Sequence, residues 1–316
     1  VLTTLRFFWN SKQGTQPDAT GYKGFYYHFL DMDSGCRAGK CEISIIDSTI
    51  LIAGALAAGC YFDRKNEQEQ EIRRLADDLY RRMEWPWVLD DTGKVLMAWQ
   101  PEDGLLPWCW EGYNESILLH VLALGSPTYP LPSQTYRAFT STYLWREVYG
   151  HELVCNHYSG PLFIHQLSHI WIDFRGIQDD FMREKGIDYF ENSRRATYTQ
   201  QAYAIHNPRK FRGYGEHCWG ITASDGPGPA QLTIDGIERN FFAYEARGVP
   251  FGPDDGTLSP WAVVASLPFA PEIVLPTLHY FNEAYPEMTS EYGFKCSFNP
   301  TFIDGDSTEK GWISKG

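Results

Sequence analysis

Residues 43–82 read ISIIDSTILIAGALAAGCY, then FDRK, then NEQEQEIRRLADDLYRR, and this stretch decides the predicted fold. The first part, Ile43–Tyr61, has the apolar density of a helix that is buried on most sides. The second part, Asn66–Arg82, places apolar residues such as Ile72 and Leu75 at three- and four-residue steps on a charged surface. The stretch therefore predicts an inner helix followed by an outer, amphipathic helix.

The same pairing recurs along the chain. Further helical segments are expected at Tyr113–Leu124, Ser133–Tyr149, Leu162–Asp173, Tyr189–Ile205, Ser259–Phe269 and Glu272–Tyr285. Short hairpin strands within loops are expected at Lys94–Ala98, Gln231–Ile234 and Asn240–Tyr244. Paired helices without a central sheet predict an all-α helical toroid with long functional loops, and no domain boundary interrupts residues 1–316.

The composition excludes several classes of partner. Lys and Arg number 27 against 40 Asp and Glu, a net charge of −13, which makes nucleic acid and anionic membranes poor partners. No stretch reaches the roughly 20 apolar residues that span a bilayer. Seven scattered cysteines argue against a disulfide framework and a zinc cluster. Only Cys36 and Cys41 are near enough in sequence to pair, and free thiols are an equally open reading.

Three carboxylates stand next to apolar or aromatic sequence. Glu42 and Asp47 flank the start of the first apolar helix, where an unpaired buried carboxylate would cost several kcal/mol, so Asp47 is expected in a solvated cleft or beside a partner. Glu115 follows WCWEGYN at the start of another apolar helix, and such surroundings favour the raised pKa that a general acid needs. The alternative for all three is a structural role at a helix N-terminus.

The segment PLFIHQLSHIWIDFR places His165, His169 and Asp173 four residues apart, on one face of a predicted helix, with Arg175 just beyond. A His-x-x-x-His pair can chelate zinc, but residue 166 is Gln where the H-E-x-x-H motif has Glu. Histidines that support a sugar site through hydrogen bonds are therefore favoured, and we expect no metal and no cofactor.

Two further segments complete the candidate site. DYFENSRRAT offers carboxylates and adjacent arginines near a helix start, and YGEHCWGITASDGP reads as a cleft wall. No glycine loop for phosphate and no G-x-S-x-G elbow occurs, so kinase, dinucleotide and serine hydrolase readings lose their main support. The candidate substrate-binding residues are Tyr27, Trp110, Tyr113, His165, His169, Asp173, Arg175, Asp188, Glu191, Arg194, Trp219 and Asp225.

Seven segments carry a resemblance to a known family: GFYYHFLD, WEGYNE followed by LALGSPT, GPLFIHQLSHIWIDFRGI, DYFENSRRAT, CWGITASDGP, DDGTLSPWA and SLPFAPE. They resemble the bacterial glucoamylase-like proteins that include the endo-β-1,2-glucanases of glycoside hydrolase family 144. The resemblance implies an (α/α)6 toroid, a cleft at one end, no metal, and a periplasmic or secreted location. About eight helices are expected where a closed toroid of this kind needs twelve, so either the chain is part of a longer protein or the toroid is open.

The resemblance also assigns roles to single residues. Glu115 matches the family's acid, and Asp47 falls where the family has the glutamate of a D-x-x-E pattern, which here reads SIID from Ser44. We therefore expect endo-acting, inverting hydrolysis of a β-1,2-glucan, with Glu115 as general acid and Asp47 or Glu42 as general base. The alternatives are a retaining transglycosylase similar to the cyclisation module of cyclic β-1,2-glucan synthases, and a non-catalytic glucan-binding protein.

Overall fold

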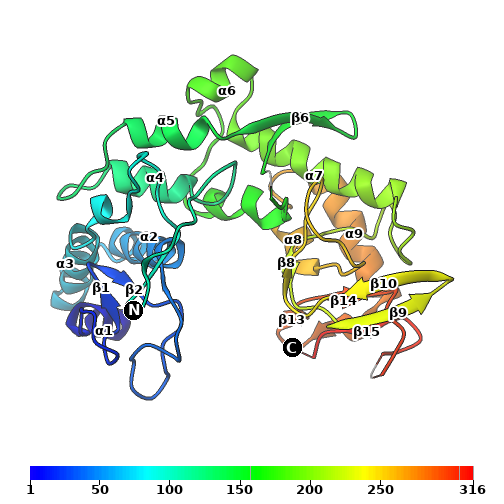
Figure 1. The fold of residues 1–316 in the computed structure, drawn as a ribbon, viewed down its shortest axis with the longest axis horizontal. Coiled ribbons are helices and arrows are strands. Elements are labelled where there is room, and N and C mark those ends of the chain that lie inside the picture. The colour runs from blue at the N-terminus through cyan, green and yellow to red at the C-terminus, as the bar shows by residue number, and fades with distance from the viewer. Residues whose placement is uncertain (157, 306, 316) are drawn as a thin grey trace. The chain divides into compact units, whose positions relative to one another are not determined.

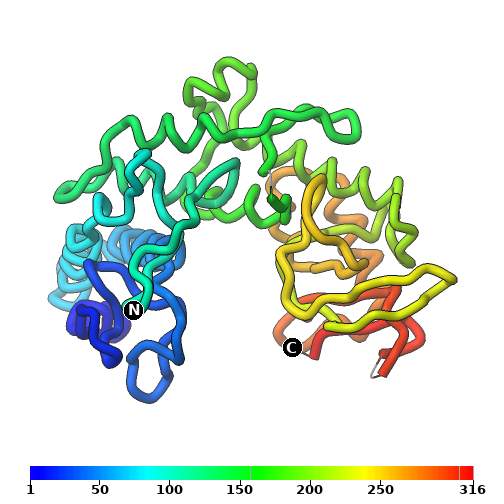
Figure 2. The backbone as a smooth tube through the Cα atoms, in the orientation of Figure 1, coloured from blue at the N-terminus to red at the C-terminus, as the bar shows by residue number. Residues whose placement is uncertain are grey.

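The computed structural model describes residues 1–156, 158–305 and 307–315, and the chain forms two compact units. Unit 1 comprises residues 1–111 and 116–142, whereas unit 2 takes residues 112–115 and the chain from Tyr143 onward. The backbone traced in Figure 2 therefore enters unit 2 briefly, returns to unit 1, and then enters unit 2 again. Within the described residues, no helix is long and apolar enough to cross a membrane.

Unit 1 consists of helices with short strands between them (Figure 1). The helices are α1 (Leu2–Asn10), α2 (Ile45–Tyr61), α3 (Glu67–Arg81), the 3-10 helix η1 (Trp85–Val88), α4 (Ile117–Leu124) and α5 (Gln134–Thr140). The strands are β1 (Gly21–Tyr22), β2 (Phe25–Tyr26), β3 (Ile43–Ser44), β4 (Ala98–Gln100) and β5 (Gly104–Leu105). Strands β1 and β2 pair with each other, and β3, β4 and β5 form a small antiparallel sheet.

Helices α2 and α3 confirm the first predicted pair. Ser44 caps α2 by accepting a hydrogen bond from the backbone N–H of Asp47, and Asn66 caps α3 in the same way through Glu69. The apolar stripe of α3, which includes the buried Leu75, packs into the core of unit 1. Burial of that stripe is what holds an otherwise charged helix in place.

Unit 2 mixes helices with hairpins. Its helices are the 3-10 helices η2 (Leu162–His165), η3 (Leu167–Ile170) and η4 (Pro286–Met288), and the α-helices α6 (Asp180–Lys185), α7 (Tyr189–His206), α8 (Pro260–Ala265) and α9 (Pro271–Ala284). Its strands are β6 (Leu144–Val148), β7 (His151–Cys155), β8 (Ala223–Ser224), β9 (Ala230–Ile234), β10 (Ile237–Phe241), β11 (Glu245–Ala246), β12 (Thr289–Ser290), β13 (Gly293–Phe294), β14 (Phe298–Asn299) and β15 (Trp312–Ile313).

A buried ion pair ties the loops of unit 2 together. The guanidinium of Arg247 donates to both carboxylate oxygens of Asp255, at 2.7 and 2.8 Å, and neither side chain is exposed. Arg247 also donates to the backbone carbonyls of Ser224, Phe242 and Ala243. One side chain therefore connects β8 with the segment between β10 and β11.

The predicted all-α (α/α)6 toroid is wrong. The part of the chain that the structure describes contains nine α-helices together with seven small antiparallel sheets, a mixed architecture. Two of the hairpins turn at residue pairs with positive φ, Tyr149-Gly150 (49° and 81°) and Asp235-Gly236 (55° and 77°). This backbone conformation matches the twist of paired strands, and Gly and Asp adopt it more readily than most residues. The β9–β10 hairpin confirms the short strand expected at Gln231–Ile234, whereas β6 lies where we expected the end of a helix.

Some of the predicted helices are confirmed, whereas others begin later, end earlier or do not form. The helices expected at Tyr189–Ile205 and Glu272–Tyr285 are confirmed as α7 and α9. The helix expected from Tyr113 begins only at Ile117, and the one expected over Ser133–Tyr149 ends at Thr140 and is followed by β6. The expected Leu162–Asp173 helix is wrong, because the segment forms two short 3-10 turns.

All seven cysteines are free thiols, so the pairing of Cys36 with Cys41 does not occur in this structure. The thiol of Cys41 instead donates to the backbone carbonyl of Phe29 at 3.2 Å. Both residues are only partly buried.

Candidate active site

A histidine joins two of the candidate catalytic carboxylates in unit 1. The ring of His28 places Nδ1 2.8 Å from Glu42 Oε1 and Nε2 3.5 Å from Asp47 Oδ2. Ser44 Oγ also donates to Asp47 Oδ2, at 2.5 Å. Burial raises the pKa of Glu42, but hydrogen bonds from its own backbone N–H and from His28 outweigh it, and the pKa lies below its usual value. Glu42 is therefore held as a carboxylate.

The backbone explains why these residues meet. Tyr27 pairs with Ile43 in an antiparallel bridge, and the N–H of His28 donates to the carbonyl of Glu42 at 2.8 Å. Asp47 follows in the first turn of α2. His28 lies inside the GFYYHFLD segment but was not among the predicted site residues, because the loop that separates it from Glu42 hides the pairing register from the sequence.

Phe29 stacks on this cluster, and two further candidate aromatic residues, Tyr27 and Trp110, also belong to unit 1. The ring of Tyr27 is buried beneath the guanidinium of Arg37, which lies 5.0 Å from the ring centroid. Phe29 is 60% exposed, and its ring stacks on that of His28 with centroids 4.2 Å apart. Trp110 belongs to unit 1 as well, where it is half-buried against the core, and its buried Nε1 has no hydrogen-bond partner among the described residues.

Glu115 lies in unit 2 and is only 8% exposed. Its backbone carbonyl accepts a hydrogen bond from Ser168 Oγ at 2.8 Å. Nearby, Tyr113 is buried and its ring stacks on those of His165 and Tyr189. Burial, with a smaller contribution from the charge of Glu115, raises the pKa of Tyr113 to about 12. Glu115 is therefore a buried carboxyl group within electrostatic range of the Tyr113 hydroxyl.

His165 and His169 belong to η2 and η3, and the predicted helix face is therefore wrong. Burial lowers the pKa of His165 to about 3 and that of His169 to about 4, so both rings are neutral near pH 7. His165 Nδ1 accepts a hydrogen bond from Asn192 Nδ2 at 3.4 Å, and His169 Nε2 lies 2.9 Å from Ser193 Oγ. These hydrogen bonds fix both rings against α7.

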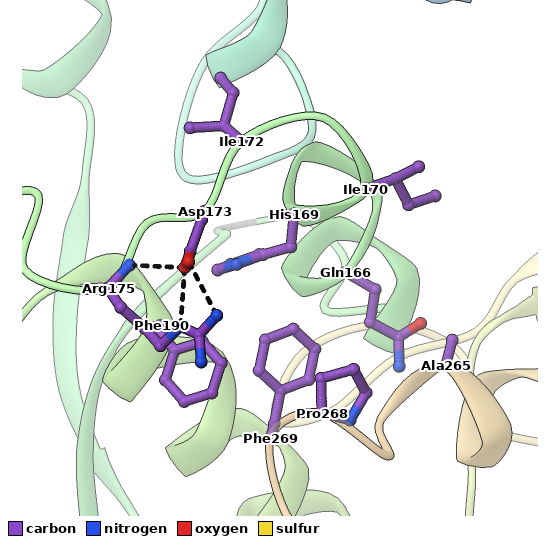
Figure 3. A pocket seen from close by; sticks show the side chains of 10 residues that line it. All are labelled: Gln166, His169, Ile170, Ile172, Asp173, Arg175, Phe190, Ala265, Pro268 and Phe269. Atoms are coloured by element: carbon purple, nitrogen blue, oxygen red, sulfur yellow. Dashed lines mark hydrogen bonds and ion pairs between the residues drawn. The ribbon is translucent and has the colours of Figure 1, made fainter. Parts of the chain in front are cut away.

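A pocket of about 300 Å³ in unit 2 collects three of the predicted residues (Figure 3). Its lining comprises Gln166, His169, Ile170, Ile172, Asp173, Arg175, Phe190, Ala265, Pro268 and Phe269. Figure 3 shows Asp173 bound by Arg175, whose Nε and Nη2 donate to the carboxylate at 2.8 and 2.7 Å. These hydrogen bonds lower the pKa of Asp173.

The rest of this pocket combines apolar and polar surface. The rings of Phe190 and Phe269 lie 5.2 Å apart between centroids and form an aromatic wall. Gln166 donates through its amide to the carbonyl of Ala262 and to Ser266 Oγ, whereas its buried Oε1 has no partner among the described residues. An acceptor beside aromatic surface suits a ligand that has both C–H faces and hydroxyl groups. The sequence prediction missed Gln166, Phe190 and Phe269 as lining residues.

Asp188, Glu191 and Arg194 lie on or next to α7. Asp188 caps the helix by accepting from the backbone N–H of Glu191 at 2.7 Å, and it also accepts from the N–H of Gly176 at 2.8 Å. Arg194 lies 3.6 Å from the Glu191 carboxylate, and both line a separate hollow of about 520 Å³ beside the β6–β7 hairpin. Of the two arginines considered, Arg195 makes the closer contact with Glu191, at 2.8 Å.

Trp219 and Asp225 lie apart from these pockets. Trp219 is fully buried in the hydrophobic core of unit 2, where its Nε1 donates to Thr277 Oγ1 at 2.8 Å. Asp225 is exposed, and its backbone carbonyl accepts from Ser297 Oγ. Unit 2 thus brings His169, Asp173 and Arg175 to one pocket and leaves Trp219 in the core.

No cluster of three or more His, Cys, Asp or Glu side chains that could hold a metal ion occurs among the described residues. The imidazole of His28 lies between Glu42 and Asp47.

The chain is similar to a family of glucoamylase-like proteins and to proteins named for their action on β-1,2-linked glucans. Residues 107–316 match the family model described as "Putative glucoamylase". The chain is 28% identical over 318 residues to the exo β-1,2-glucooligosaccharide sophorohydrolase (non-reducing end) of Parabacteroides distasonis, a match that covers 90% of this chain and 41% of that protein. The chain thus spans about two fifths of the length of this curated relative.

Two crystal structures are similar over most of this chain. One is a glucoamylase-family protein from Bacteroides uniformis, at 30% identity and a TM-score of 0.80, covering 99% of this chain and 71% of that one. The other is the endo-β-1,2-glucanase of Chitinophaga pinensis, in complex with sophorotriose and glucose, at 25% identity and a TM-score of 0.75, covering 95% and 69%. The matched family model includes Glu115, whereas Glu42 and Asp47 precede it.

Proposed function

The chain belongs to the family described as "Putative glucoamylase", and on this premise we propose that it is a glycoside hydrolase acting on β-1,2-glucans or their oligosaccharides. The relatives from Parabacteroides distasonis and Chitinophaga pinensis, whose substrates are β-1,2-linked, support this substrate class. A periplasmic or secreted location belongs to the same proposal and rests on the family resemblance alone.

Glu115 is the proposed general acid. Its burial, at 8% exposure, is the observation that carries the proposal, because burial favours the protonated form of a carboxyl group. A protonated acid can deliver a proton to the glycosidic oxygen as the bond breaks.

The proposed general base comes from the cluster in unit 1. An inverting hydrolase needs an ionised carboxylate that activates a water molecule. Glu42 and Asp47 both qualify by chemistry, since Glu42 has a lowered pKa and Asp47 is half exposed to water. The proposed reaction is therefore inverting, with Glu115 as acid and one of these two carboxylates as base.

The mode of action is proposed to be endo. An endo enzyme releases oligosaccharides of several lengths from linear β-1,2-glucan at early times, whereas an exo enzyme of the Parabacteroides type would release sophorose alone. Chromatography of the early products separates the two. Products longer than the substrate would indicate the transglycosylase alternative, and glucan binding without new reducing ends would indicate a non-catalytic protein.

The Glu115→Gln variant tests the acid directly. The amide keeps the size of the side chain but delivers no proton, so kcat on β-1,2-glucan should fall by about 10² to 10⁴-fold while glucan binding persists. Measuring kcat, binding and Tm on the same preparation distinguishes catalysis from structure. A variant that remains active but melts earlier would remove Glu115 from the chemistry.

A further inference from the structure

His28 is the side chain that touches both candidate bases. Nδ1 lies 2.8 Å from Glu42 Oε1, and Nε2 lies 3.5 Å from Asp47 Oδ2. The side chains of His28, Glu42 and Asp47 are 37, 30 and 49% exposed, so the cluster is open to water but not fully solvated. The three groups form a line in which the imidazole separates two carboxylates.

The number of protons shared by Glu42, His28 and Asp47 decides which hydrogen bonds these three side chains can form. A neutral imidazole carries one N–H, and the shorter contact places that proton on Nδ1, where it donates to Glu42. Nε2 then presents a lone pair to Asp47 Oδ2. Two acceptors face each other across this longer contact, and a hydrogen bond forms there only when a proton arrives.

We propose that Asp47, and not Glu42, is the general base, and that His28 is the positioning residue that accepts a hydrogen bond from Asp47 once Asp47 has taken a proton from water. This inference rests on the proposed hydrolase function. The water O–H bond breaks as the water oxygen bonds to the anomeric carbon, and its proton moves to Asp47. The departing glycosidic oxygen takes up a proton from the general acid as its bond to the anomeric carbon breaks, so protons and charges balance. His28 Nε2 stabilises the protonated Asp47, and Glu42 stabilises positive charge on the imidazole.

The surroundings hold the ring in this orientation. Phe29 covers one face of the imidazole at 4.2 Å, and the backbone N–H of His28 donates to the Glu42 carbonyl. The other groups that face the cluster are the hydroxyl of Ser44, which donates to Asp47 Oδ2, and the guanidinium of Arg37, which favours the charged form of Glu42. Arg37 is itself paired with Glu102, at 2.7 Å.

Three variants separate the roles of these residues. Asp47→Ala should lower kcat most, by about 10² to 10⁴-fold, and added formate should restore part of the rate because it supplies a carboxylate to the vacant base position. His28→Phe keeps the ring stack on Phe29 but removes both nitrogens, and it should lower kcat by about 10- to 100-fold with KM little changed. His279→Phe, on the exposed face of α9, is the matched control and should keep the wild-type rate.

A pH profile supplies a readout that a purely structural role would not move. The acidic limb of kcat/KM should shift in His28→Phe, because Asp47 has lost its acceptor and Glu42 its donor, whereas the control should retain the wild-type limb. His28→Gln, which keeps a donor for Glu42 but offers no ring nitrogen to Asp47, should match His28→Phe in rate and serves as the second variant if the phenylalanine protein does not fold.

Two outcomes would overturn the inference while leaving the hydrolase proposal intact. One is a wild-type rate in both His28 variants. The other is formate rescue of Glu42→Ala in place of Asp47→Ala, which would make Glu42 the base. A wild-type protein that releases nothing from β-1,2-glucan would instead contradict the proposed function itself.

Discussion

At the scale of single residues, the buried histidines of unit 2 make stability depend on pH. The pKa of His165 is lowered to about 3 and that of His169 to about 4, mainly by burial. Above the ordinary histidine pKa of about 6.5, both the folded and the unfolded chains hold these rings neutral, and they have no pH effect. Below it the unfolded chain binds protons that the folded chain does not, so the free energy of unfolding falls as the pH drops from 6.5 to 4.

We therefore predict that urea unfolding midpoints decrease between pH 6.5 and 5, a range that lies above the lowered pKa values of Glu42 and Asp173. Each buried histidine contributes a slope of up to about 1.4 kcal/mol per pH unit. His169→Gln keeps a hydrogen-bonding group for Ser193. It removes one of the groups that bind a proton on unfolding, so the slope of unfolding free energy against pH should fall by the contribution of one histidine. An equal slope in the variant and the wild type would contradict the predicted burial of a neutral ring.

Residue chemistry was predictable where it depends on sequence neighbours and not where it depends on distant contacts. Asp47 and Glu42 could be placed together because they are near neighbours in sequence, with Glu42 just before β3 and Asp47 in the first turn of α2. His28 could not, since only the bridge between Tyr27 and Ile43 brings it to them. Trp219 was expected on a cleft wall, and no local signal distinguishes an exposed tryptophan from one whose Nε1 donates to Thr277 on α9.

At the scale of secondary-structure elements, Asp188 is a predicted substrate-binding residue that also caps the N-terminus of α7. Its carboxylate accepts from the backbone N–H groups of Glu191 and Gly176, both of which would lack a partner without it. Asp188→Ala should therefore lower the free energy of unfolding by about 0.5 to 2 kcal/mol. Asp188→Asn keeps a side-chain acceptor and should lose much less.

Activity distinguishes this capping role from the predicted substrate contact. If Asp188 only caps α7, the alanine and asparagine variants should retain KM on β-1,2-glucan, and their Tm values should differ from each other. A rise in KM in the asparagine protein at unchanged Tm would instead indicate direct contact of the carboxylate with substrate.

Helices with strong periodicity were predictable, and short elements were not. α3 and α9 follow from apolar spacing and capping residues. The β6–β7 hairpin was read as the end of a helix, because Leu144–Val148 alternates only weakly in burial and its turn, Tyr149-Gly150, carries a positive φ at a tyrosine. Tertiary contacts with α7 stabilise β7 there, as when Asn192 accepts a hydrogen bond from the N–H of Val154.

At the scale of the whole molecule, the organisation into two compact units was not foreseen, and the single-domain interpretation stays a prediction. The chain crosses between units within WEGYNE, a segment with no change in composition to mark it. The DDGTLSPWA segment was noted only for its family resemblance. In the structure its Asp255 is the buried partner of Arg247, eight residues earlier in the chain.

This ion pair leads to a prediction about the stability of unit 2. Removing one partner of a buried pair leaves the other charge without compensation, which typically costs about 3 to 5 kcal/mol. Arg247→Met should therefore strongly destabilise unit 2, because Asp255 would keep only the backbone N–H groups of Phe242 and Thr257. Urea unfolding measures the loss, and hydrogen exchange of the β8 and β11 amides should accelerate with it.

The chain offers a matched control for this prediction in the same unit. Arg212 forms the same bidentate ion pair with Asp235, at 2.8 and 2.5 Å, but the two side chains are 41 and 49% exposed. Because water screens an exposed pair, Arg212→Met should cost no more than about 1 kcal/mol. The double variant Arg247→Met/Asp255→Leu removes both buried charges and should recover part of the stability that Arg247→Met loses. Equal losses in Arg247→Met and Arg212→Met would mean that burial does not set the strength of the Arg247 pair, and that β8 and β11 are held by their backbone hydrogen bonds alone.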